Sequence, residues 1–198
     1  TSTQMIYIYA QTNTTPNCTD ESSFSITINV TPTAEIISDE TRCKNNPFML
    51  PILSSGNNYY TGSMGTGTML NAGDSISSTQ MIYIYATSGT APNLCTNQSS
   101  FTITFVELPE VTLSGGCINN VYTIEANAFG TNSVSYQWLN SSDTVVGTNS
   151  SIFTPSTDGL YKCIVSFTLP SGSTCSSTTA VFTANGTLCQ IQKGISPN

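Results

Sequence analysis

The sequence predicts an all-β protein built from tandem antiparallel β-sandwich modules stapled by disulfides. Three observations predict this class: a long repeat, strands in which apolar and polar residues alternate, and seven cysteines without a single histidine. The octapeptide Thr-Gln-Met-Ile-Tyr-Ile-Tyr-Ala occupies residues 3–10 and again residues 79–86, which lie 76 positions further along. A period of this size is close to one small sandwich. The chain is therefore expected to be a piece of a tandem array.

The repeat extends beyond the octapeptide and predicts a hairpin in each copy. Residues 24–28 (FSITI) correspond to residues 101–105 (FTITF), and Pro32 corresponds to Pro109. Apolar and polar residues alternate here, which is typical of a half-buried antiparallel strand. A turn-rich loop separates each such strand from the octapeptide, so each copy predicts a hairpin that closes a module.

Four segments follow from the repeat. Residues 1–32 are expected to be the C-terminal hairpin of a truncated sandwich repeat, and residues 33–109 a complete repeat. Residues 110–190 are expected to form a second, divergent module, and residues 191–198 a linker. Because an isolated two-stranded hairpin is only marginally stable, we expect the natural protein to continue upstream.

The divergent module carries a motif of its own. Residues 136–138 (YQW) precede residues 158–163 (DGLYKC), and together they resemble the immunoglobulin pattern, in which a core Trp faces a Cys and a Tyr caps the adjacent corner. Trp138, Tyr161 and Cys163 would take these places. The stretch 121–126 has no cysteine, so the usual disulfide of that family cannot form. Cys163 is therefore either a buried thiol or paired elsewhere.

Composition excludes several kinds of partner. The net charge is −7, only 8% of residues are charged, and Lys and Arg together number four. So few cations cannot follow a nucleic-acid backbone or an anionic lipid surface. No apolar run approaches the ~20 residues of a membrane helix, so no membrane insertion is expected. Seven cysteines indicate an oxidising, extracellular compartment.

The repeat also predicts disulfides. Cys43 and Cys117 each end the first strand of a module, whereas Cys95 and Cys175 each precede a last strand. The predicted pairs are Cys43–Cys95 and Cys117–Cys175.

Three cysteines remain. Cys18 is equivalent to Cys95, so its partner is expected upstream and it is unpaired by truncation. Cys163 and Cys189 either pair with each other or stay free, and the sequence leaves both alternatives open.

No catalytic machinery or cofactor site is expected. Without histidine, a nucleophilic triad of the usual kind is excluded. The acidic pairs at 39–40 and 107–110 flank predicted joints, where they could bind Ca²⁺ between modules, but solvated loop charges are the preferred interpretation. The tyrosine doublet Tyr59–Tyr60 lies beside Asn and Gly residues and is the candidate for an exposed contact patch.

The tail, residues 193–198 (KGISPN), resembles the opening of a type B C-terminal sorting domain of the type IX secretion system. With the cysteine-containing β-repeats before it, the chain resembles the repeat region of SprB-like gliding-motility adhesins. The resemblance implies export, attachment at the bacterial cell surface and contact with the secretion and gliding machinery. It also implies O-glycosylation at Ser75 and Thr144, each of which follows an Asp and precedes an aliphatic residue.

Two functions are therefore consistent with the sequence. The first is a non-enzymatic stalk segment of a secreted adhesin in gliding motility, whose partners are neighbouring repeats and an external surface or polysaccharide. The alternative is a set of accessory carbohydrate-binding modules of a secreted polysaccharide-degrading enzyme.

Overall fold

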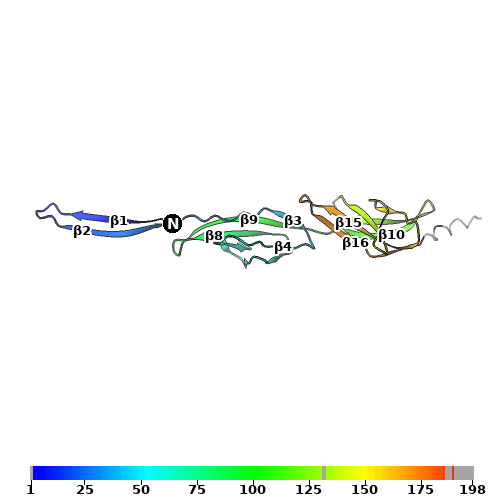
Figure 1. Cartoon of the computed structure of the whole chain (residues 1–198), viewed down its shortest axis with the longest axis horizontal. Helices are drawn as coiled ribbons and strands as arrows, with labels where there is room; N and C mark the ends of the chain where they lie inside the picture. Colours follow the sequence, from blue (N-terminus) through cyan, green and yellow to red (C-terminus); the bar gives the residue numbers. More distant parts are fainter. Residues whose placement is uncertain (1, 131–132, 186–188, 190–198) are drawn as a thin grey trace, which may run out of the picture. The chain divides into compact units, whose positions relative to one another are not determined.

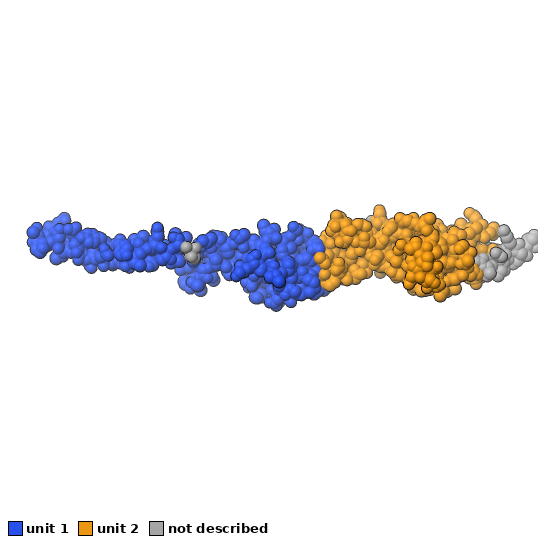
Figure 2. Space-filling model, viewed as in Figure 1, with its two compact units in different colours: residues 1–40, 48–103 blue, residues 41–47, 104–198 orange. Residues whose placement is uncertain are grey.

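The computed structural model describes residues 2–130, 133–185 and 189. It confirms an all-β fold made of antiparallel sheets. The chain divides into two compact units, residues 1–40 with 48–103 and residues 41–47 with 104–198 (Figure 2). The module boundaries expected near residues 32 and 109 stay a prediction, as does the linker at 191–198, which lies outside the described residues.

The first unit begins with the predicted hairpin. Strand β1 (Ser2–Gln11) pairs with β2 (Thr19–Ile28) in a two-stranded antiparallel sheet, which Figure 1 shows without a third strand beside it. The second copy of the repeat forms β8 (Gln80–Ser88) and β9 (Cys95–Val106). The two hairpins share one register: Gln4 faces Ile26 in the first, and the equivalent Gln80 faces Ile103 in the second.

In the first unit, β8 and β9 lie inside a larger sheet. The strand order is β3-β9-β8-β5-β6, with β3 at Glu40–Cys43, β5 at Asn57–Tyr60 and β6 at Met69–Leu70. Strands β4 (Phe48–Met49) and β7 (Ser75–Ile76) form a second, two-stranded sheet. A 3₁₀ turn, η1, spans Ser63–Gly65.

The buried side chains of this unit come from both sheets, because Phe101 of β9 packs against a residue of β4 in the second sheet and against a residue of β5 in its own sheet. The phenyl ring of Phe101 contacts those of Phe48 and Tyr59 edge-on, with centroids 6.1 and 6.3 Å apart. Ile82, Ile84 and Ile103 are fully buried beside them. The alternation that predicted half-buried strands is therefore confirmed for β9, whereas the corresponding strand β2 is exposed along its whole length, so that part of the prediction is wrong.

The second unit is an immunoglobulin-like sandwich. One sheet has the order β10-β11-β14, formed by Glu110–Ile118, Val121–Phe129 and Ile152–Phe153. The other has the order β13-β12-β15-β16, formed by Val145–Val146, Ser135–Asn140, Gly159–Thr168 and Thr174–Thr178. Strand β17 (Phe182–Ala184) pairs with the start of β15.

The expected core residues occupy the expected places. Trp138 on β12 faces Cys163 on β15, and both are fully buried. The indole stacks on Phe153 at 5.2 Å between ring centroids, and its Nε1–H donates a hydrogen bond to the Ser150 carbonyl. The Tyr161 hydroxyl donates to the carbonyl of Thr157, four residues upstream, at 2.9 Å. This bond is the tyrosine corner of immunoglobulin-like domains.

Both predicted disulfide pairs are wrong. The bonds are Cys43–Cys175 and Cys117–Cys189, while Cys18, Cys95 and Cys163 are free thiols. Cys163 is thus a buried thiol and does not pair with Cys189.

Strand length explains the error for Cys43. Its neighbour Lys44 donates its backbone N–H to the carbonyl of Val106, at the C-terminal end of β9. Cys95 begins the same strand, so roughly 35 Å of extended backbone separates it from that end. A disulfide requires Cα atoms within about 7 Å. Aligning the repeats correctly placed Cys43 and Cys117 near the ends of their strands, but it could not show which strand ends meet.

Candidate functional site

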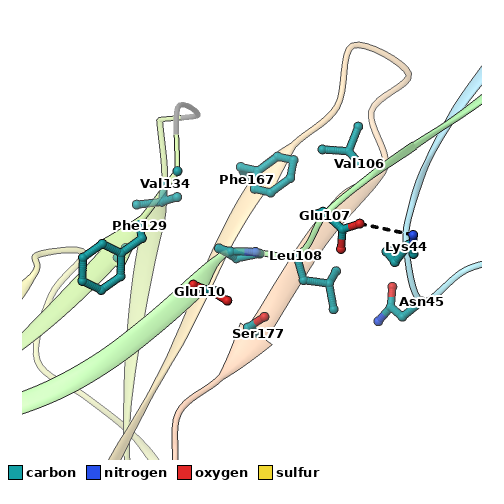
Figure 3. Close-up of a pocket in the computed structure, with 13 residues that line it drawn as sticks. Lys44, Asn45, Val106, Glu107, Leu108, Glu110, Phe129, Val134, Phe167 and Ser177 are labelled. Carbon is teal, nitrogen blue, oxygen red and sulfur yellow. Dashed lines mark ion pairs between the residues drawn. The ribbon is translucent and has the colours of Figure 1, made fainter. Parts of the chain in front are cut away.

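A hollow lies in the second unit. It has a volume of about 1010 Å³, and Figure 3 shows its walls. One wall is the segment from the end of β9 into β10, and another is formed by residues that directly follow Cys43. The ends of β11 and β15 and one residue of β16 complete the lining. The central lining residues are Lys44, Val106, Leu108, Phe129, Val134 and Phe167.

A disulfide positions this pocket. The Cys43–Cys175 bond holds the segment after β3 against β16, with the two Cα atoms 5.4 Å apart. Around this bond, Phe167 and Leu169 form a buried cluster, against which Val106, Leu108 and Val134 pack. The backbone of Lys44 is fixed as well, by its hydrogen bond of 2.9 Å to Val106. The pocket therefore depends on a disulfide that differs from the pairs predicted from the sequence.

The chemistry of the pocket is that of a binding surface. Its floor is aliphatic and aromatic, and the Phe129 ring is 60% exposed. At the rim, Lys44 Nζ forms an ion pair with Glu107 Oε1 at 3.2 Å, and Glu110 lies nearby (Figure 3). Both partners of the pair are exposed to water, so it adds little stability. An apolar floor with a few polar groups suits an apolar side chain or the face of a sugar ring.

The tyrosine doublet is not an exposed contact patch. Tyr59 is only 2% exposed, and its hydroxyl donates to the Pro51 carbonyl at 3.1 Å. Burial, and secondarily the charge of Glu35, raises the pKa of Tyr59 to about 12. Tyr60 points to the other face of β5 and packs edge-on against Tyr85. Successive residues of a strand face opposite sides, so a doublet on β5 cannot present two rings to one ligand.

The acidic residues at the expected joints have structural partners. Asp39 Oδ1 accepts the backbone N–H of Thr102 at 2.7 Å, and Glu107 pairs with Lys44. Within the described part of the chain, no group of three or more His, Cys, Asp or Glu is placed to hold a metal ion.

The two expected glycosylation sites are exposed. Ser75 lies on β7, and Thr144 lies in the turn between β12 and β13. In that turn, the side-chain carbonyl of Asn140 accepts the Thr144 N–H at 3.0 Å. Modification of either residue stays a prediction, and the tail at 193–198 lies outside the described residues.

Sequence reasoning singled out Glu107 and Glu110 as acidic residues at a joint, but it missed the rest of the pocket. Lys44 and Phe129 carry no motif, and they lie far apart along the chain. They come together only because the Cys43–Cys175 bond brings the segment after β3 to β16. A correct disulfide pairing was the one signal that could have located them.

Comparisons with known proteins add little to this description of the pocket. No family model matches the chain, and no curated protein does either. A solved structure, the amphioxus IgVJ-C2 molecule, is 14% identical with a TM-score of 0.28, over 75% of this chain and 100% of that one. The similarity is too distant to bear on function. The assignment of the second unit rests on its strand order, its buried Trp138 and its tyrosine corner.

No described helix is long and apolar enough to cross a lipid bilayer.

Proposed function

We propose that this chain is a structural and adhesive stalk segment of a secreted, non-enzymatic bacterial cell-surface adhesin that serves gliding motility. The observation that carries the proposal is the repeated hairpin, formed twice from one octapeptide in one register. Near-identical β modules in series are typical of spacers and of multivalent binders. The two disulfides are typical of proteins that fold in an oxidising compartment, which supports an extracellular location.

The partners proposed for the segment follow from its sequence. The tail resembles the opening of a type IX sorting signal, which supports contact with that secretion system and with the gliding machinery. The scarcity of cationic residues supports an uncharged external partner, such as a polysaccharide, over nucleic acid.

Surface labelling of the bacterium that makes the protein tests this function. Fluorescent antibody fragments raised against the 198-residue chain should label intact, unpermeabilised cells, and the labelled spots should move along gliding cells. Removing the segment from the genomic copy should reduce spreading on agar, whereas an in-frame epitope tag at the same place should not. Labelling that requires permeabilisation would contradict the proposal.

A stalk must also limit its own extension under load, which single-molecule force spectroscopy measures. The Cys43–Cys175 bond bridges a sequence separation of 132 residues. Pulling on the chain ends should extend these residues only after reduction. At 3.3–3.6 Å per residue, reductant should add roughly 450 Å of contour length. Equal contour lengths with and without reductant would show that the bond bears no load.

The exposed Phe129 ring in the pocket favours the alternative, accessory carbohydrate binding. Affinity electrophoresis in gels that contain soluble polysaccharides tests it. Retardation that is lost in Phe129→Ala but kept in Val181→Ala, a change at another exposed apolar residue, would support this function. Unchanged mobility in every gel would remove it.

A further inference from the structure

Two copies of one hairpin have different surroundings in this chain. In the second copy, the outer edge of β8 pairs with β5, so that Asn57 faces Ala86 and Tyr60 faces Tyr83. On its apolar face, Phe48 and Tyr59 contact Phe101, and Leu50 and Ile76 of the same unit are buried as well. Every one of these covering residues belongs to the segment 33–78.

The first copy has the same apolar face, but here the face is exposed. Sheet β1-β2 has two strands, and within the described part of the chain no strand pairs with the outer edge of β1. Side chains whose counterparts are fully buried are exposed here: Ile8 is 56% exposed, whereas the equivalent Ile84 is 0% exposed. Phe24 and Ile26 are also exposed, although their counterparts Phe101 and Ile103 are buried. An exposed apolar strand with an open edge is a template for another polypeptide strand.

We propose that hairpin β1-β2 is a docking site for a polypeptide segment of the kind that residues 33–78 form. The incoming segment adds an antiparallel strand along Tyr7–Ala10, as β5 does along Tyr83–Ala86. Its aromatic residues cover Phe24, as Phe48 and Tyr59 contact Phe101. The proposal deepens the stalk function and rests on it, because this docking would join successive repeats.

A second observation concerns Cys95 and identifies a covalent anchor for the same segment. Cys95 begins β9, and Cys175 lies near the start of β16, so each is near the start of the second strand of its hairpin. Val106 packs against the Cys43–Cys175 pair. By the repeat offset, the counterpart of Val106 in the first hairpin is Asn29, and the Cys95 sulfur lies 3.9 Å from the Asn29 carbonyl oxygen.

Cys95 therefore lies beside Asn29, and in the second unit Cys175 belongs to the buried cluster against which Val106 packs. There, Cys175 forms its disulfide with Cys43, which lies in the same cluster. By analogy, the geometry assigns a position beside Cys95 to the cysteine of the incoming segment that corresponds to Cys43. Oxidation joins the two thiols in a new S–S bond. A disulfide oxidant such as oxidised glutathione accepts the two electrons, and its own S–S bond breaks to give two thiols that take up the protons.

The test uses the whole 198-residue chain and a synthetic polypeptide of residues 33–78 with a fluorescent label. Fluorescence anisotropy measures binding under reducing conditions, and non-reducing peptide mapping locates any bond formed in a glutathione redox buffer. We expect saturable binding of one polypeptide per chain and a bond between its Cys43 and Cys95 of the chain.

Matched variants separate docking from anchoring. Ile8→Asp, on the apolar face of β1, should weaken binding at least about tenfold, since a carboxylate would be buried unpaired. Met5→Asp, on the opposite face, should not. Cys95→Ser should abolish the covalent bond and keep the binding, whereas Cys18→Ser should change neither. On the polypeptide, Tyr59→Asp should weaken binding, which tests the contact without altering the chain.

Three results would overturn the proposal. They are absence of binding, equal binding to the Ile8→Asp and Met5→Asp variants, and cross-linking to Cys18 as often as to Cys95. Self-association of the chain that blocks the polypeptide would assign the face to a second copy instead, and would also overturn it. Failure here leaves the surface-labelling result intact, so it can be told apart from failure of the proposed function.

Discussion

Hairpins β1-β2 and β8-β9 share an octapeptide and a register, yet they differ in burial along their whole length. Every residue of β1 and β2 is exposed, whereas β8 alternates between buried and partly exposed positions. The sequence of the first strand cannot cause the difference, because the octapeptide that contains Ile6 and Ile8 recurs unchanged around Ile82 and Ile84. Among the described residues, only the second hairpin has β5 paired with its outer edge and β4 packed against its apolar face.

The comparison shows which property belongs to the local sequence and which to the context. The repeated strand sequences determine strand formation and register, and both are the same in the two copies although the loops differ by one inserted residue, Leu94. Stability is determined by the cover, because burial of apolar surface is the main favourable term in folding. Most of the predictions below therefore compare a covered position with an uncovered one.

Thiol labelling should give the largest difference. Cys18 is exposed beside the open hairpin, whereas Cys163 is buried opposite Trp138. A buried thiol reacts only when the domain opens, which costs 5 kcal/mol or more in a typical domain. We expect Cys163 to react at least about a thousandfold more slowly than Cys18 with a neutral alkylating reagent, followed by mass spectrometry. Comparable rates would show that the second unit is loosely packed.

Equivalent truncations in the two hairpins should differ next. Ile84→Ala removes a fully buried side chain and should cost about 3 kcal/mol of unfolding free energy. Ile8→Ala makes the same change at an exposed position and should cost less than about 0.5 kcal/mol. Urea unfolding of both variants measures the difference. Equal losses would mean that β1 is covered in solution.

Alkaline pH should give the smallest effect. Burial raises the pKa of the Cys163 thiol to about 11, from an ordinary value of 9.0. Between these values the folded state retains a proton that the unfolded state has lost, so stability falls as the pH rises from 9 to 11. We expect this group to contribute about 1 kcal/mol, or roughly 2–4 °C in Tm.

The matched pair for this measurement carries Cys18→Ser and Cys95→Ser, so that no exposed thiolate attacks the disulfides. Adding Cys163→Ala should flatten the dependence of Tm on pH between 9 and 11. Identical slopes with and without Cys163 would refute the assignment.

The elements that the sequence predicted well are those set by local pattern. The repeated octapeptide predicted both hairpins, and the spacing of Trp138, Tyr161 and Cys163 predicted the core of the second unit. Such features need only neighbouring residues or one sheet face. The sequence left open whether Cys163 is a buried thiol or is paired elsewhere, and the structure shows it as a free, buried thiol.

Features that depend on where strand ends meet could not be predicted. Cys43 and Cys95 lie at opposite ends of β9, which repeat alignment does not reveal. Tyr59 looked exposed because Asn and Gly surround it, but strand alternation directs it into the core against Phe101. The pocket around Phe129 depends on the Cys43–Cys175 bond, so an incorrect pairing concealed it.

Amide hydrogen exchange on the intact chain tests the central claim most directly, namely that an identical strand is stable only where residues like 33–78 cover it. The hydrogen-bonded amides of β8 should be protected by several kcal/mol, close to the stability of the whole unit. Those of β1, in a hairpin that is marginal by itself, should exchange about a thousandfold faster. Equal protection of the two strands would contradict the account.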